Sequence, residues 1–153
     1  MTPPDAKAIE NIGFMLQDVA RLMRCEYNRR VQELALTQAQ WRALSILSRK
    51  PGLRQNQLAE MLEMQPISIG RLIDRLQAAG WVERKADPTD RRALQLYLTA
   101  QSEPILAQLK KHGAACRAAV LAGVSEEEQR EFLDILSRMR ANMAAAVEGE
   151  CRA

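Results

Sequence analysis

The sequence is poor in the residues that build metal sites, disulfides and membrane spans. It contains one histidine, His112, and three widely spaced cysteines, Cys25, Cys116 and Cys151, with no Cys-x-x-Cys pair. This set offers neither the ligands for a first-row metal nor a disulfide framework. No apolar run approaches the roughly 20 residues of a membrane span, and the first residues lack the basic-then-apolar layout of a signal peptide. We therefore expect a cytoplasmic protein with no metal site and no membrane contact.

Catalytic motifs are missing as well. The sequence has no glycine-rich phosphate loop, and its single histidine leaves no nucleophile with a partnering base. We therefore predict that the protein is not an enzyme, and we predict neither catalytic residues nor a cofactor.

What the sequence does contain is enough apolar residues for a packed core and an uneven distribution of charge. Hydrophobic residues make up 47% of the chain, which favours a folded protein over disorder. Residues 49–92 carry nine basic against six acidic side chains, whereas residues 124–150 carry three against seven. A basic middle segment suits a polyanionic partner, although unevenly charged solvated surface explains the charge alone equally well.

Periodic apolar residues predict helices at both ends of the chain. Residues 9–34 show one apolar stripe at spacings of three or four, which predicts one long helix. A further helix is expected to be capped by Thr99 or Ser102 and to end at Gly123. The last helix begins with a capping box from Ser125 to Glu128 and carries Phe132 and Met143 on its apolar face.

Three short helices are expected in the middle. Thr37 and Gln40 form a capping box for the first of them, which stops before Pro51-Gly52. The third is expected to begin at Pro66 and to end at Gly80. Residues 81–86 and 93–99 then flank a polar turn, with apolar residues alternating in the second stretch. The expected fold class is mainly α with a small β-hairpin wing, in the order of a winged helix-turn-helix.

The third short helix has the pattern of a DNA-reading helix. Its expected buried stripe is Ile69, Leu72, Ile73 and Leu76, and its expected outward set is Gln65, Ile67, Ser68, Gly70, Arg71, Asp74 and Arg75. A major groove about 12 Å wide admits such a helix. An amphipathic core helix explains the stripe equally well, but not the glycine, the arginines and the neighbouring turn together.

The run "LTQAQWRALSILSRKPGLRQNQLAEMLEMQPISIGRLIDRLQAAGWVERKADPTDRRALQLYLT", residues 36–99, closely resembles the DNA-binding core of the MarR/SlyA family of bacterial transcription regulators. The most specific part is the wing motif, which comprises Asp87, Asp90, Arg91, Arg92, Leu98 and Thr99. Two positions depart from the family pattern. Arg54 stands where Ser or Thr usually caps the second short helix, and Ile67 stands where a small polar residue is common.

The resemblance implies a homodimeric regulator that represses transcription from a pseudo-palindromic DNA operator with half-sites about 10 bp apart. Residues 1–36 and 100–148 are then the helical dimerisation region, residues 37–99 the DNA-binding domain and residues 149–153 a flexible tail. The expected DNA-binding residues are Gln65, Ile67, Ser68, Gly70, Arg71, Arg75, Arg91 and Arg92. Asp74 and Asp90 are expected to support the wing by pairing with arginines.

The resemblance also implies that a small aromatic or phenolic effector releases the DNA. Candidate residues for its cleft are Met15, Val19, Met23 and Trp41, although packing of the junction explains them better. A thiol-based redox sensor that uses Cys25, which follows Arg24, is an alternative. A winged helix that contacts only other proteins is a second alternative, but it would not need four arginines on one surface.

Overall fold

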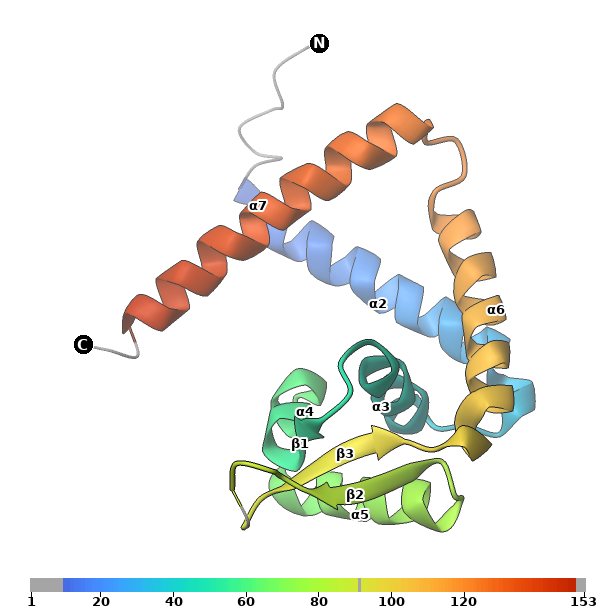
Figure 1. Ribbon diagram of the computed structural model, residues 1–153. Helices are drawn as coiled ribbons and strands as arrows, with labels where there is room; N and C mark the ends of the chain where they lie inside the picture. Colours follow the sequence, from blue (N-terminus) through green and yellow to red (C-terminus); the bar gives the residue numbers. More distant parts are fainter. Residues whose placement is uncertain (1–9, 91, 151–153) are drawn as a thin grey trace. The chain divides into compact units, whose positions relative to one another are not determined.

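The computed structural model describes residues 10–90 and 92–150, with side chains described for residues 10–90 and 92–147 (Figure 1). The helices and strands, in chain order, are α2 (Ile12–Arg30), η1 (Gln32–Leu34), α3 (Gln38–Arg49), β1 (Leu53–Arg54), α4 (Gln55–Leu62), α5 (Pro66–Ala78), β2 (Val82–Ala86), β3 (Leu94–Leu98), η2 (Ala100–Ser102), α6 (Glu103–Val120) and α7 (Glu126–Glu150). None of the helices within the described ranges is long and apolar enough to span a membrane.

The predicted fold class is confirmed: the chain is mainly helical and carries a small antiparallel sheet. The sheet has three strands in the order β1-β3-β2. The predicted hairpin, β2 and β3, is therefore joined by a third strand, β1, which pairs with β3. Leu53 of β1 pairs with Leu96 of β3, which also pairs with Arg84 of β2. In Figure 1, the helices α3, α4 and α5 gather around this sheet.

Gly52 makes the third strand feasible. Its φ of +81° is a left-handed conformation that favours glycine, and its N–H donates to the carbonyl of Leu96 at 3.0 Å. A side chain here would meet the hydroxyl of Tyr97, which lies 2.9 Å from the position of a Cβ. The turn after α3 is therefore shaped to bring residues 53 and 54 alongside β3.

The predicted capping boxes are present. Thr37 Oγ1 accepts from the N–H of Gln40 at 3.3 Å, and Gln40 Oε1 accepts from the N–H of Thr37 at 2.9 Å. Ser125 and Glu128 make the same reciprocal pair at 3.3 and 2.8 Å. Each box satisfies two backbone donors that a helix N-terminus leaves open. Local sequence therefore determines where α3 and α7 begin.

The first helix differs from its prediction over residues 9–34. Residue 9 lies outside the described residues, α2 ends at Arg30, and a 3-10 turn, η1, follows. Val31 between them is 1% exposed, and Ala35 closes the turn in a left-handed conformation. The tighter winding of a 3-10 turn redirects the chain toward α3, which a periodic apolar pattern does not reveal.

The core of the winged helix unites α3, α4, α5 and the sheet. Its buried residues are Val31, Ala43, Leu44, Leu47, Leu58, Ala59, Leu62, Ile69, Leu72, Ile73, Leu76, Val82, Leu96 and Leu109. Leu96 is fully buried, but Leu94, which belongs to the same alternating apolar stretch, is 50% exposed. Leu94 pairs with Ala86 at the far end of the hairpin, beyond the reach of the core.

The chain divides into two compact units, and the boundary in the sequence lies between Cys116 and Arg117. The first unit contains the winged helix together with α2 and most of α6. In the second unit α7 runs through Glu150, so residues 149 and 150, expected to begin a flexible tail, continue the helix. The remainder of that tail, with Cys151, lies outside the described residues.

Candidate nucleic-acid interface

Helix α5 presents the two faces that were predicted from its sequence. Its buried residues are Ile69, Leu72, Ile73 and Leu76, and its exposed residues include Gln65, Ile67, Ser68, Arg71, Asp74 and Arg75. Pro66 occupies the first turn after the N-cap Gln65, as predicted. The exposed face thus combines an amide, a hydroxyl, an aliphatic side chain and two guanidinium groups, all free of the core.

Ile67 is the most exposed apolar residue of this helix. Its side chain is 69% exposed, although burial of an isoleucine would stabilise the fold by a few kcal/mol. It lies one residue before Ser68, on the outward surface at the N-terminal end of α5. An exposed aliphatic group at this place is available for contact with a partner.

Gly70 is not required by packing within the protein. A Cβ at this position would lie 3.6 Å from Nε2 of Gln55, which is an ordinary van der Waals distance. A glycine inside a helix costs about 0.5–1 kcal/mol relative to alanine. The fold therefore has room for a methyl group here, and no close contact among the described residues requires the glycine.

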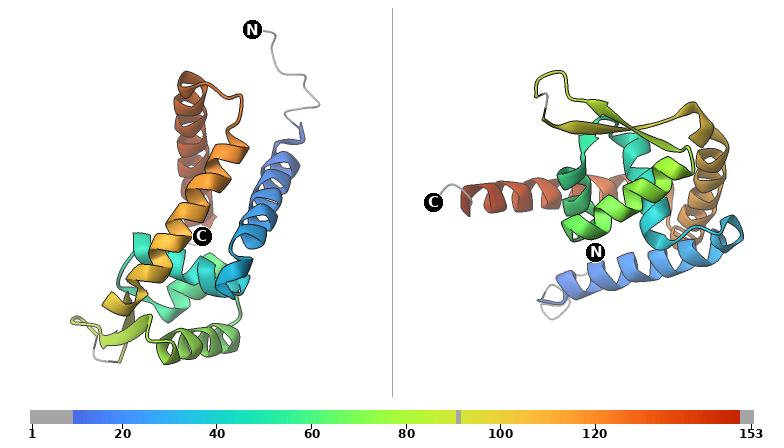
Figure 2. Two further views of the ribbon diagram at one scale, coloured as in Figure 1. Left: turned by 90° about the vertical axis from the view of Figure 1, so that its right-hand side faces the viewer. Right: turned by 90° about the horizontal axis from the view of Figure 1, so that it is seen from below.

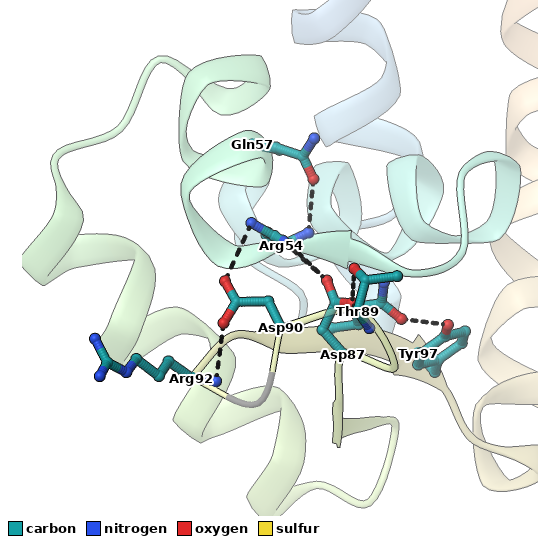
Figure 3. A network of polar contacts seen from close by, with 8 residues as sticks. Arg54, Gln57, Asp87, Thr89, Asp90, Arg92 and Tyr97 are labelled. Carbon is teal, nitrogen blue, oxygen red and sulfur yellow. Dashed lines mark hydrogen bonds and ion pairs between the residues drawn. The ribbon is translucent and has the colours of Figure 1, made fainter.

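The turn between β2 and β3, residues 87–93, is organised by Asp87 (Figure 3). Asp87 Oδ1 accepts hydrogen bonds from the backbone N–H and the hydroxyl of Thr89, at 2.8 and 2.7 Å. The N–H of Asp87 donates to the carbonyl of Ala93 at 3.0 Å, and the N–H of Ala93 donates to the carbonyl of Asp90. Asp87 is 4% exposed, so a buried carboxylate holds the turn through these hydrogen bonds.

Arg54 holds the other oxygen of the same carboxylate. Its Nε and one terminal nitrogen both donate to Asp87 Oδ2, at 3.1 and 2.7 Å, and its other terminal nitrogen lies 3.9 Å from Asp90 Oδ2. The pKa of Asp87 is held far below its ordinary value by the two hydrogen bonds from Thr89 and then by Arg54. The predicted site residues did not include Arg54. Its position at the N-cap of α4 could have indicated a role outside helix capping. An arginine side chain cannot accept hydrogen bonds from the N–H groups of the first turn.

Both carboxylates that were expected to support the wing by pairing with arginines lie close to an arginine. Asp74 accepts a hydrogen bond from Arg84 of β2 at 2.7 Å. Asp90 accepts from the backbone N–H of Arg92 at 3.1 Å and lies near Arg54. Within residues 10–90 and 92–150, neither carboxylate forms an ion pair with the guanidinium of Arg71, Arg75 or Arg92.

Among the described residues, Arg92 is a wing arginine whose guanidinium forms no ion pair with Asp74 or Asp90. Its side chain is exposed, and Figure 3 shows the guanidinium extending away from Asp90. Arg91, the other arginine predicted to bind DNA, lies outside the described residues. The turn projects beyond the helices, and Figures 1 and 2 place it along the same side of the first unit as α5.

Three of the residues proposed for an effector cleft, Met15, Val19 and Met23, are spread along α2, and the fourth, Trp41, lies on α3. Met15 and Val19 are 64% and 40% exposed. Trp41 lies by the C-terminal part of this helix, where its Nε1 donates to Asn28 Oδ1 at 2.7 Å and its ring lies 4.3 Å from that of Tyr27. Met15 is thirteen residues before Asn28, or about 20 Å along a helix. Of the three candidates on α2, Met23 is the nearest along the helix to this junction, four residues before Tyr27.

Cys25 is exposed on α2, whereas Cys116 is buried. The side chain of His112 is largely covered, and its Nε2 lies 3.1 Å from a carboxylate oxygen of Glu33. Among the described residues, no group of three or more histidine, cysteine, aspartate or glutamate side chains is arranged to hold a metal ion.

Known proteins share both the sequence pattern and the fold. The model of the MarR family matches residues 36–94. The crystal structure of the transcriptional regulator PA3341 is 34% identical, with a TM-score of 0.78, and the match covers 87% of this chain and 98% of that one. A transcriptional regulator of the MarR family from Silicibacter pomeroyi is 29% identical, with a TM-score of 0.75 over 85% and 88% of the two chains.

The transcriptional regulator SlyA is 26% identical, with a TM-score of 0.73 over 89% of this chain and 96% of that one. These matches extend well beyond the winged helix, into the helices on either side of it. The chain therefore belongs to the MarR family of transcription regulators.

Proposed function

We propose that this protein is a homodimeric, sequence-specific DNA-binding repressor. One observation carries the proposal: the exposed polar face of α5 and the wing with Arg92 lie on one side of the same compact unit. A helix of this kind reads base edges in the major groove, while the wing meets the adjacent backbone and minor groove. The outward residues of α5 supply the donors and acceptors for this reading.

Each residue of the face has a chemistry that suits DNA. Gln65 can pair with the N6 and N7 positions of adenine, and Ile67 can contact a thymine methyl group. Ser68 can bond to a base edge or a phosphate, and Arg71 and Arg75 can reach guanine or phosphate. Gly70 leaves room for the backbone of the helix to approach the DNA closely. Arg92, and Arg91 beside it, would neutralise phosphates or enter the minor groove.

The dimer is supported by exposed apolar side chains on two helices, α2 and α7. On α2, Phe14 is 75% and Leu22 is 51% exposed, and on α7, Phe132 is 49% and Leu133 is 61% exposed. Apolar surface concentrated on terminal helices marks a site of association. We propose that a second copy covers these residues, so that two-fold symmetry places two α5 helices about one DNA turn apart.

Selection from randomised duplexes tests this function. The purified protein is incubated with a pool of random double-stranded DNA at moderate salt, and bound molecules are amplified and sequenced. The proposal expects an inverted repeat whose half-site centres are about 10 bp apart. Recovery of unrelated sequences after repeated rounds would show that the protein does not read DNA sequence.

For the release step, we propose a small aromatic or phenolic effector that acts at the junction of α2, α3 and α6. Three contacts support this place: the tilted contact between the rings of Tyr27 and Trp41, the bond from Trp41 to Asn28 and the bond from the Tyr27 hydroxyl to the carbonyl of Leu109 at 2.7 Å. An aromatic compound that separates the two rings would alter how α2 meets the winged helix. Substituted benzoic and phenolic acids should change tryptophan fluorescence and weaken duplex binding together.

The alternative release mechanism uses the thiol of Cys25, which is exposed. Peroxide treatment of the wild-type protein and of Cys25→Ser separates the two mechanisms. Loss of duplex binding in the wild type alone would favour the thiol, whereas equal binding by both treated proteins favours the effector.

A further inference from the structure

Arg54 occupies a place for which its side chain is poorly suited. It is the N-cap of α4, where Ser, Thr, Asp and Asn are favoured because their oxygens accept hydrogen bonds from the first turn. A guanidinium group only donates, and a positive charge is unfavourable at the positive end of a helix dipole. The reason for an arginine at this position therefore lies in contacts other than helix capping.

Those contacts are with the wing, thirty-three residues further along the chain. Two nitrogens of Arg54 donate to Asp87 Oδ2, and the third lies 3.9 Å from Asp90 Oδ2. Asp87 uses its other oxygen to hold Thr89. The same carboxylate thus joins the start of α4 to the turn between β2 and β3, as Figure 3 shows.

The capping of α4 does not depend on this side chain. The backbone N–H of Arg54 donates to Gln57 Oε1 at 2.9 Å, which is the half of a capping box that an arginine permits. The guanidinium is left free to point toward the wing. Its side chain is 41% exposed, whereas Asp87 is 4% exposed, so the ion pair lies at the edge of the structure with one buried partner.

We propose that Arg54 is a positioning residue for the wing. By holding Asp87 and lying beside Asp90, it fixes the β2–β3 turn against the N-terminus of α4, so that Arg92 meets DNA from a preformed turn. It also places a positive charge beside two carboxylates that would otherwise repel phosphate. This inference rests on the proposed function, because it assigns the wing to the DNA interface.

The variants are chosen so that the fold is preserved. Arg54→Thr removes the guanidinium but supplies a favoured N-cap, so α4 should remain intact. Asp87→Asn keeps an oxygen for Thr89 but removes the charge that Arg54 binds. Arg54→Lys keeps the charge but loses the paired donors of a guanidinium. Arg49→Thr, on an exposed residue of α3, removes the same charge without touching the wing. Thermal unfolding of each variant verifies the fold.

Amide hydrogen exchange of the protein without DNA measures the wing directly. In Arg54→Thr, the amides of residues 87–93 should exchange about tenfold faster, a loss of ~1.4 kcal/mol in local protection. Those of α5 should be unchanged, and Arg54→Lys should restore part of the protection. Unchanged exchange of residues 87–93 in Arg54→Thr would overturn the inference.

Duplex binding by the single and double variants then separates positioning from direct contact. Arg54→Thr should weaken binding about tenfold (~1.4 kcal/mol) in the wild-type background, and much less when Asp87→Asn is already present. Arg49→Thr should have a smaller effect. An equal loss in both backgrounds would mean that Arg54 binds phosphate itself, which contradicts the inference. Absence of sequence preference in the wild type would defeat the proposed function, and the exchange experiment would still test the wing.

Discussion

Arg84 of β2 donates a hydrogen bond to Asp74 of α5 at 2.7 Å. A second nitrogen of Arg84 donates to Gln77, one turn further along the same helix. The candidate reading helix is thus attached to the first strand of the wing by one arginine, and Arg54 attaches the turn of the wing to α4. Because Arg84 and Arg54 are engaged within the protein, the arginines expected to contact a phosphate backbone are Arg71, Arg75, Arg91 and Arg92.

This division of the arginines predicts a difference in salt dependence. Arg92→Ala should weaken duplex binding and lower the slope of log affinity against log salt by about 1, because one phosphate contact is lost. Arg84→Ala, the matched control, removes an arginine that is already paired and should leave the slope nearly unchanged. The slopes are measured by fluorescence anisotropy over a salt series. A larger fall in slope for Arg84→Ala than for Arg92→Ala would contradict the assignment.

Gly70→Ala should separate folding from DNA binding. The added methyl group has room beside Gln55, so the free energy of unfolding should stay the same or rise by up to about 1 kcal/mol. Affinity for the selected duplex should nevertheless fall, because the methyl group would stand between α5 and the DNA. Chemical denaturation and duplex titration measure the two effects. Undiminished affinity would show that α5 does not approach DNA at this residue.

Ser68→Ala should change which sequences are preferred. The hydroxyl is exposed on α5, and its loss should alter the ranking of operator variants while binding to random DNA stays the same. Competition among duplexes that differ at single base pairs measures the ranking. If the variant ranks them as the wild type does, Ser68 takes no part in reading bases.

The carboxylate of Asp87 should make the free energy of unfolding depend on pH at acidic pH. Its pKa is lowered in the folded protein by Thr89 and Arg54, so the folded state keeps the charged form where the unfolded state, with a pKa of about 3.9, takes up a proton. The contribution of Asp87 to the free energy of unfolding is therefore complete above the pKa of the unfolded state and is lost as the pH falls below that value. The difference in unfolding free energy between the wild type and Asp87→Asn should be constant from pH 5 to 7 and shrink below about pH 4. Parallel curves down to pH 3 would show that the Asp87 carboxylate is not stabilised by folding.

Phe132→Glu should disrupt association. Phe132 is 49% exposed on α7, and a charge would be costly to bury where a second copy is proposed to pack. Sedimentation should show a dimer for the wild type and a shift toward monomer for the variant, with a parallel loss of duplex affinity. Glu131→Gln on the same helix is the control and should remain dimeric. A wild type that sediments as a monomer at micromolar concentration would contradict the dimer.

Features governed by local sequence could be predicted. The spacing of Ile69, Leu72, Ile73 and Leu76 specified the buried face of α5, and the pairs Thr37–Gln40 and Ser125–Glu128 specified two helix starts. Each depends on residues three or four apart, which is the scale at which helix periodicity acts.

Features that depend on contacts between distant segments could not be predicted. Strand β1 has two residues, too few for any alternation, and exists because Gly52 turns the chain toward Leu96. The bond from Arg54 to Asp87 joins residues thirty-three positions apart, so no periodic pattern connects them. Asp74 of α5 pairs with Arg84 of β2. Several arginines lie near Asp74 in the sequence, and the sequence alone does not show which of them is the partner.

Titration of the selected duplex and a scrambled duplex of the same composition, each over a salt series, tests the central claim most directly. The account predicts that the selected duplex binds far more tightly at moderate salt and that its affinity falls steeply as salt increases, because several phosphates are neutralised. Equal affinity for the two duplexes, with little dependence on salt, would contradict the assignment of α5 and the wing to a DNA interface.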